Sequence, residues 1–158
     1  MSEFHLAQLN IAQMQTPIDD PAMKDFVDNL EGVNKIAESS PGYVWRLQTD
    51  EGDATAIRIF GSDMLLVNMS VWESVEQLKS FVYESFHLEL LKRKKEWFSK
   101  FDKAYQVMWW IRAGTEPSIE EAERRLVYLQ ENSESPYAFS FRQSFPPSED
   151  HLVLPEHK

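Results

Sequence analysis

The order of hydrophobic patterns along this chain of 158 residues predicts an α+β fold, an antiparallel sheet with helices on one face. Three observations support this prediction. Strand-like alternation and helix-like spacing follow one another as β-α-β-β-α-β, with an extra helix and strand at the end. Two capping boxes mark helix starts, and turn residues separate the elements. This order is the ferredoxin-like plan, which leaves the second face of the sheet uncovered.

The first half of the chain contains four of these elements and one short strand. Alternation predicts a strand at 4–13. An Asp-Pro cap begins a helix over 20–40, which a Pro-Gly pair ends. Strands follow at 43–48 and, after a short strand at 56–60, at 64–72. The last of these is expected to be a central strand.

A capping box of Ser74 and Gln77 begins the second helix of the plan. The helix breaks near 85–86, and a basic, aromatic segment follows, with His87 at its entrance. That basic run, 92–95, is interpreted as a solvated face rather than a nucleic-acid site.

The rest of the chain completes one domain over 1–145. A strand is expected at 104–113, and a second capping box at 118–121 begins a third helix. The residues at 137–145 read as a short strand that reaches across to a partner, and 146–158 as a polar tail.

Composition limits the functions to consider. The net charge of −10 argues against nucleic acid and against anionic membrane surfaces as partners. Cysteine is absent, so disulfides, thiolate nucleophiles and cysteine metal sites are excluded, and histidine spacing gives no support for a metal site. The chain shows no signal-peptide pattern and no apolar run of roughly 20 residues, so a cytoplasmic location is expected.

Apolar side chains lie on both faces of the central strand, with Val67 and Met69 on one and Leu66 and Trp72 on the other. An uncovered apolar sheet face is a dimerisation surface. We therefore expect a homodimer joined through the sheet face.

Several blocks of the chain closely resemble a bacterial family catalogued as domain of unknown function 3291. They are HLAQLNIA, DDPAMKDFVDNLEGVNKIAESSPGYVWRLQ, SVWESVEQLKSFVYESFH, RKKEWF, WWIRAG and SPYAFSFRQSF, in this order from about Phe4 to Phe145. The family is similar in architecture to dimeric α/β-barrel proteins, among them antibiotic-biosynthesis-type monooxygenases and haem-degrading enzymes. The resemblance implies a dimeric α/β barrel, while its activity stays open because such folds host many functions.

His87 is the first candidate for chemistry, as a general base or a ligand. In haem-degrading proteins of this barrel a helical histidine ligates iron, so haem is one cofactor that the resemblance suggests; otherwise the cofactor is unknown. The alternative is a structural histidine that bonds a helix end and a carboxylate such as Glu84.

Asn68 and Trp72 project from the same face of their strand, with Ser70 between them. The cofactor-free monooxygenases of this resemblance use Asn and Trp side chains to hold a polyphenolic substrate. This implies that Asn68 polarises a small aromatic ligand and that Trp72 binds it. The alternative is a buried, satisfied Asn beside a core Trp.

Other side chains are expected to add polar groups or flat walls to the same cavity. Arginine suits a carboxylate bidentately, and indole rings suit an aromatic ligand. Only one of Trp109 and Trp110 can face the cleft, since neighbours on a strand alternate. The candidates are Gln8, Asn10, Arg46 and Arg112, with Trp45 and Trp110 as walls.

Two functions remain open. One is a small monooxygenase-like enzyme that acts on an aromatic or haem-like ligand between the helices and the sheet. The other is a non-catalytic dimeric ligand-binding or interaction protein.

Overall fold

The computed structural model describes residues 3–48, 59–60, 64–84, 93–100, 103–148 and 152. They contain an antiparallel sheet of five strands: β1 (Phe4–Met14), β2 (Tyr43–Arg46), β3 (Leu65–Trp72), β4 (Phe98–Ser99) and β5 (Gln106–Arg112). Their α-helices are α1 (Lys24–Ser39), α2 (Val75–Glu84) and α4 (Ile119–Asn132). In this described part, no helix has both the length and the apolar character that crossing a membrane requires.

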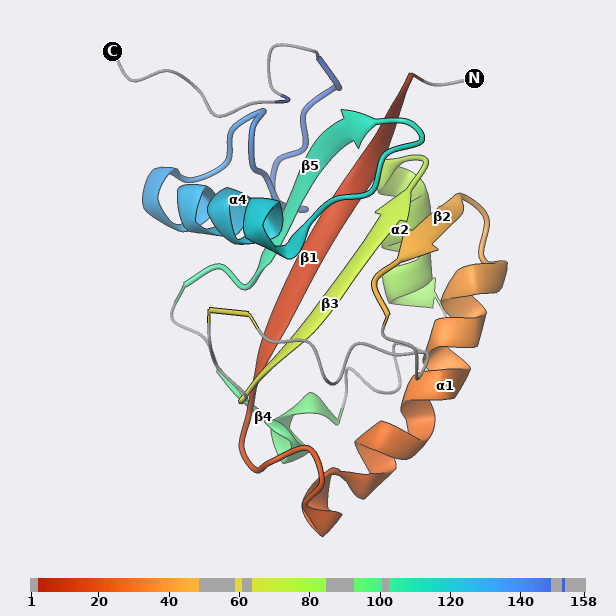
Figure 1. Ribbon diagram of the computed structural model, residues 1–158, viewed down its shortest axis with the longest axis vertical. Coiled ribbons are helices and arrows are strands. Elements are labelled where there is room, and N and C mark those ends of the chain that lie inside the picture. Colours follow the sequence, from red (N-terminus) through yellow and green to blue (C-terminus); the bar gives the residue numbers. More distant parts are fainter. Residues whose placement is uncertain are drawn as a thin grey trace.

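The long strand β1 organises the sheet (Figure 1). It pairs with β3 along one edge and with β5 and the short β4 along the other, while β2 lies outside β3. The long strands therefore follow the order β2-β3-β1-β5. This is the order of the ferredoxin-like plan, so the α+β fold predicted from the sequence is confirmed.

The predicted caps begin the helices. Asp20 accepts a 2.9 Å hydrogen bond from the backbone N–H of Ala22, and a short 3₁₀ turn leads from there into α1. Ser118 accepts one of 3.1 Å from the N–H of Glu121 at the start of α4. Each cap satisfies an amide that the helix itself leaves unpaired.

Helices cover both faces of the sheet (Figure 1). The helices α1 and α2 of the βαββαβ unit share one face, where Leu78 packs with Leu6, Trp72 and Trp110. We call it the α1/α2 face. The extra helix α4 packs on the other, the α4 face.

The α4 face is covered, and the expectation of an uncovered apolar face is wrong for the described strands. Its nine strand side chains are 0–6% exposed within the single chain: Ala7, Leu9, Ile11, Val67, Met69, Val71, Val107, Trp109 and Ile111. They pack against Ala122, Leu126 and Leu129 of α4. The homodimer stays a prediction, but its sequence argument no longer applies.

The segment 137–145 is not the short strand that its alternation predicts. Phe139 alone pairs with Met108 of β5, through backbone hydrogen bonds of 2.7 and 3.0 Å. Tyr137 packs in the cluster on the α4 face, and Phe145 packs against the cluster on the α1/α2 face. The segment therefore crosses the edge of the sheet, and a backbone that crosses an edge cannot run along it as a strand.

Candidate functional site

A group of polar side chains interrupts the apolar α1/α2 face. We call it the polar strip; its members are Gln8, Asn10, Arg46, Asn68 and Ser70. The strand register brings them together, because Gln8 and Arg46 both lie opposite Ser70, and Asn10 lies opposite Asn68. Residues that are opposite each other in an antiparallel pair project on the same side of the sheet.

A continuous chain of hydrogen bonds runs through the polar strip. Trp72 Nε1 donates to Ser70 Oγ at 2.9 Å, and Gln8 Nε2 donates to the same oxygen at 2.8 Å. Gln8 Nε2 also donates to Asn68 Oδ1 at 2.8 Å. Trp72, Ser70 and Gln8 are buried, whereas Asn68 is exposed. The chain thus links the core to a surface amide, and each buried polar group in it has a partner.

Asn68 has its Oδ1 occupied, so its Nδ2 is the group left to bind something else. No hydrogen bond joins Nδ2 of Asn68, or the side chain of Asn10 opposite it, to another described residue. An amide N–H₂ is a pair of donors. The open end of the polar strip therefore suits a ligand oxygen, either a carbonyl or an oxyanion.

Arg46 lies at the β2 side of the polar strip. Its Nε donates to Glu38 Oε2 of α1 at 2.8 Å, and its side chain is 12% exposed. Beside it, burial raises the pKa of the Tyr43 phenol, and the charge of Glu38 raises it further. At neutral pH this side therefore presents a cation, one carboxylate and a neutral phenol.

Trp72 is enclosed in the core. It is 0% exposed; Phe81 stacks on it at 5.2 Å between ring centroids, and Tyr43 meets it edge-on at 5.8 Å. Its ring offers no open face to a ligand, which agrees with the core alternative. Its role in the site is to donate the hydrogen bond that holds Ser70.

Three other predicted residues lie away from the open end of the polar strip. Trp45 packs against the cluster on the α4 face. Trp110 lies on the α1/α2 face, but it is 9% exposed and its Nε1 donates to the Phe145 carbonyl at 2.7 Å. Arg112 lies six residues along β5 from the partner of Asn10, or about 20 Å at the rise of a strand. These three do not form one cavity with Asn68.

His87 lies outside the described residues. Within the described ranges, no group of three His, Asp or Glu side chains has an arrangement that could hold a metal ion. The predicted roles of His87 therefore stay predictions.

Sequence reasoning missed two features: the shared hydrogen-bond acceptor Ser70, and the ion pair of Arg46 with Glu38. Ser70 could have been found, because it shares a face with Asn68 and Trp72. The approach of Glu38 could not have been found, since it depends on how α1 packs on the sheet.

Arg125 is a buried polar residue that the sequence analysis did not single out. It is 1% exposed and donates to the carbonyls of Tyr137 at 2.9 Å and Leu152 at 2.7 Å, and to Glu121 at 2.9 Å. Burial lowers its pKa, and the nearby Tyr137 and Glu121 oppose that effect. Arg125 holds the C-terminal segment against α4, on the face opposite the polar strip.

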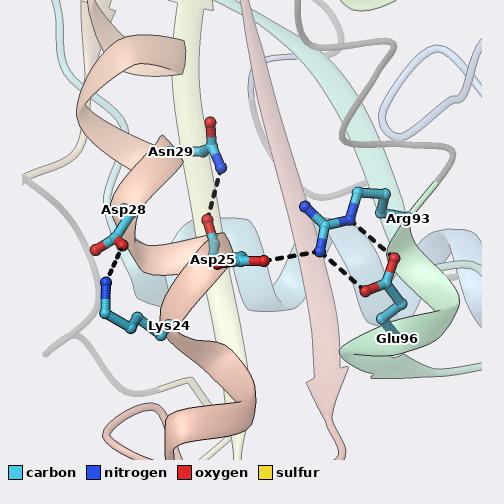
Figure 2. A network of polar contacts seen from close by, with 6 residues as sticks. All are labelled: Lys24, Asp25, Asp28, Asn29, Arg93 and Glu96. Atoms are coloured by element: carbon cyan, nitrogen blue, oxygen red, sulfur yellow. Dashed lines mark hydrogen bonds and ion pairs between the residues drawn. The ribbon is translucent and has the colours of Figure 1, made fainter.

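Arg93, in the basic run at 92–95, is paired with two carboxylates (Figure 2). Arg93 donates to Glu96 at 2.8 and 3.0 Å and to Asp25 of α1 at 3.0 Å, and its guanidinium lies 4.7 Å from the centre of the Trp97 ring. Arg93 thus joins its segment to α1 and is not a free site for phosphate.

Two open depressions occur elsewhere on the surface. One, of about 330 Å³, is bordered by residues 18–21 and by Lys24, Val27 and Asp28. The other, of about 290 Å³, is bordered by residues of α2 between Glu76 and Tyr83. Neither includes a residue of the polar strip.

The comparison with protein families gives one match over most of the chain. The model described as "Domain of unknown function (DUF3291)" matches residues 5–154. No curated protein matches the chain.

Solved structures are similar at low identity. A conserved protein from Methanosarcina mazei Go1 is 11% identical with a TM-score of 0.47, over 70% of this chain and 93% of that one. A putative antibiotic biosynthesis monooxygenase from Nitrosomonas europaea is 8% identical with a TM-score of 0.47, over 75% and 97%. A protein of unknown function from the same organism is 12% identical with a TM-score of 0.45, over 73% and 97%. Similarity at this level transfers no ligand or activity.

Proposed function

Because the chain belongs to the family described as domain of unknown function (DUF3291), which names no activity, we propose its function from the polar strip. The protein binds a small oxygen-bearing molecule at the open end of the strip. Asn68 donates hydrogen bonds to the ligand oxygen, and Asn10 lies beside it.

The observation that supports this proposal is the hydrogen-bond chain from Trp72 to Asn68. Gln8 is 3% exposed and has a fixed position between Ser70 and Asn68. It therefore holds the Asn68 amide in one orientation before any ligand arrives. Donors that are fixed in advance bind an oxygen without the loss of rotamer freedom that a mobile side chain undergoes.

The enzymatic form of the proposal is a monooxygenase-like oxidation of an aromatic ligand. When the ligand loses a proton to the base, negative charge develops on its ring oxygen. Hydrogen bonds from the Asn68 amide stabilise that charge. For a hydroxylated anthrone, whose central ring carries a CH₂ group opposite its carbonyl, the balanced reaction converts this CH₂ group and dioxygen into a second carbonyl and water, without an added reductant. His87 would act as the base in this reaction.

A haem-like ligand is a separate proposal that depends on His87 alone. The described members of the polar strip are amides, a hydroxyl and a guanidinium, and none is an imidazole. They offer hydrogen bonds to a porphyrin's carboxylates but no axial ligand, so we derive no step through haem.

Ligand binding without catalysis is the second candidate. Two observations support it. Trp72 is buried, and none of the described members of the polar strip is a residue type that titrates near neutral pH. An arrangement of this kind can hold a ligand without moving a proton.

The test combines binding and oxygen uptake. Calorimetry with 4-hydroxybenzamide as probe is expected to show binding that Asn68→Ala weakens, while Asn132→Ala, on α4, leaves it unchanged. Oxygen consumption with a hydroxylated anthrone is then measured for the same proteins. Uptake that depends on Asn68 supports the enzyme, and binding without uptake supports the second candidate. If the wild-type protein binds neither probe, the proposal fails.

A further inference from the structure

We propose that Arg46 makes the polar strip selective for a ligand with a planar oxyanion, such as a carboxylate. This inference rests on the proposed function, because it assumes that a ligand binds at Asn68. It adds the charge of the ligand and names the residue that recognises it.

The guanidinium of Arg46 is only partly used. Its contact with Glu38 is a single hydrogen bond from Nε, and no hydrogen bond joins Nη1 or Nη2 to another described residue. The side chain is nevertheless only 12% exposed. A largely buried guanidinium with a free pair of Nη nitrogens fits the two oxygens of a carboxylate.

Two other arginines, Arg93 and Arg125, differ from Arg46 in the use of their Nη nitrogens. Arg93 uses Nε and Nη2 on Glu96 and also bonds Asp25. Arg125 uses Nη1 and Nη2 on three acceptors. Arg125 thus uses both Nη nitrogens and Arg93 uses Nη2 on acceptors of the protein itself, whereas neither Nη nitrogen of Arg46 bonds another described residue.

Arg46 and Asn68 lie near each other on the same face of the sheet. Arg46 lies opposite Ser70, and Asn68 lies two residues away on the same face, a diagonal separation of about 7–8 Å between Cα atoms. Ser70 Oγ already accepts from Trp72 and Gln8. A ligand at the polar strip therefore meets two different open groups: a cation on the β2 side and a neutral amide donor on the β3 side.

An anion is attracted by the charged groups around Arg46 and not by the net charge of the chain. The chain carries a net charge of −10, so its overall field does not attract an anion. Near Arg46, burial and Glu38 raise the pKa of Tyr43, which therefore adds no negative charge at neutral pH. Glu38 is the carboxylate that Arg46 contacts, and it is 40% exposed.

The experiment compares two probes of similar size, 4-hydroxybenzoate and 4-hydroxybenzamide, by calorimetry on the full chain. The wild-type protein is expected to bind the carboxylate about tenfold more tightly, a typical effect of one charge-assisted contact. Arg46→Gln is expected to abolish this preference. Glu38→Gln is expected to increase it, because it removes the competing carboxylate. Arg124→Gln removes the same charge from an exposed position on α4 and is expected to leave it unchanged.

Each outcome decides one question. Equal affinity for the two probes in the wild-type protein, or a preference that persists in Arg46→Gln, overturns the role of Arg46 and leaves the proposed function intact. Binding of neither probe overturns both. If Arg46→Gln does not fold, Glu38→Gln still decides, because a purely structural ion pair predicts no gain in carboxylate affinity.

Discussion

Gln8 donates a 2.8 Å hydrogen bond to the Oδ1 of Asn68, which lies 60 residues further along the chain. The same nitrogen donates to Ser70, so one buried amide links two positions of β3. The surface amide of the candidate site is therefore oriented by a residue on a different strand. The predictions below test this arrangement and the fold around it.

Replacing Gln8 with Leu removes the donor shared by Asn68 and Ser70. We expect a loss of about 1–3 kcal/mol in the free energy of unfolding, typical of buried polar groups that lose a partner. Urea unfolding measures it, and binding of 4-hydroxybenzamide should weaken in parallel. The control is Gln143→Leu at an exposed position, expected to change stability by less than about 0.5 kcal/mol. Wild-type stability and affinity in Gln8→Leu would contradict the role of the hydrogen-bond chain.

Two glycines should respond in opposite directions to alanine. Gly42 has φ +86°, and a Cβ there would overlap the side chain of Gln77. Gly32 lies inside α1 with nothing within 4 Å of an added Cβ. We expect Gly42→Ala to destabilise by more than about 1 kcal/mol and Gly32→Ala to stabilise by roughly 0.5–1 kcal/mol. Thermal unfolding of both variants checks this, and destabilisation by Gly32→Ala would show that α1 is packed differently there.

The pKa of Glu96 is lowered from 4.5, chiefly by its hydrogen bond from Arg93. Because the folded-state pKa is lowered, the contribution of this pair to stability is complete above pH 4.5. It is lost as the pH falls through the folded-state pKa. An NMR titration of the Glu96 carboxyl is expected to give a midpoint below 4.5, and Arg93→Gln should return it towards that value. A midpoint that Arg93→Gln does not move would show that the contact is absent in solution.

Haem binding through His87 is a prediction from the sequence alone. Titration of the protein with haem, followed by absorption, is expected to give a saturable Soret shift that His87→Ala abolishes. His5→Ala is the control, since His5 belongs to β1. A shift that His87→Ala leaves unchanged would reject His87 as the ligand, and no shift in any of the proteins would reject haem.

The sheet-face homodimer can be tested at Met69. This side chain is 1% exposed within the single chain, on the α4 face. We therefore expect Met69→Glu to unfold the protein, because it buries a charge without a partner. Circular dichroism and light scattering distinguish the outcomes. The wild-type protein could instead have twice the mass of one 18.5 kDa chain, while Met69→Glu is folded and has the mass of one chain. That result would place the dimer interface on this face.

Much of the fold follows from local patterns. Asp20 caps the 3₁₀ turn that leads into α1, and Ser118 caps α4, where the capping patterns predict; a cap involves only neighbouring residues. Alternation correctly placed Asn68 and Trp72 on one face, because side chains alternate along any strand. The segment 137–145 was misread because its alternation is the same whether it lies along the sheet or crosses its edge.

The sequence by itself determined the β-α-β-β-α-β order of the main elements, the faces of the strands and the family, because each depends on residues that are close in the chain or on the chain as a whole. Only the tertiary structure decided that Gln8 bonds Asn68, that Glu38 accepts from Nε of Arg46, and that α4 covers the second face. The physical reason is that these contacts join elements far apart in the sequence, so they depend on strand register and helix packing, which no local pattern specifies.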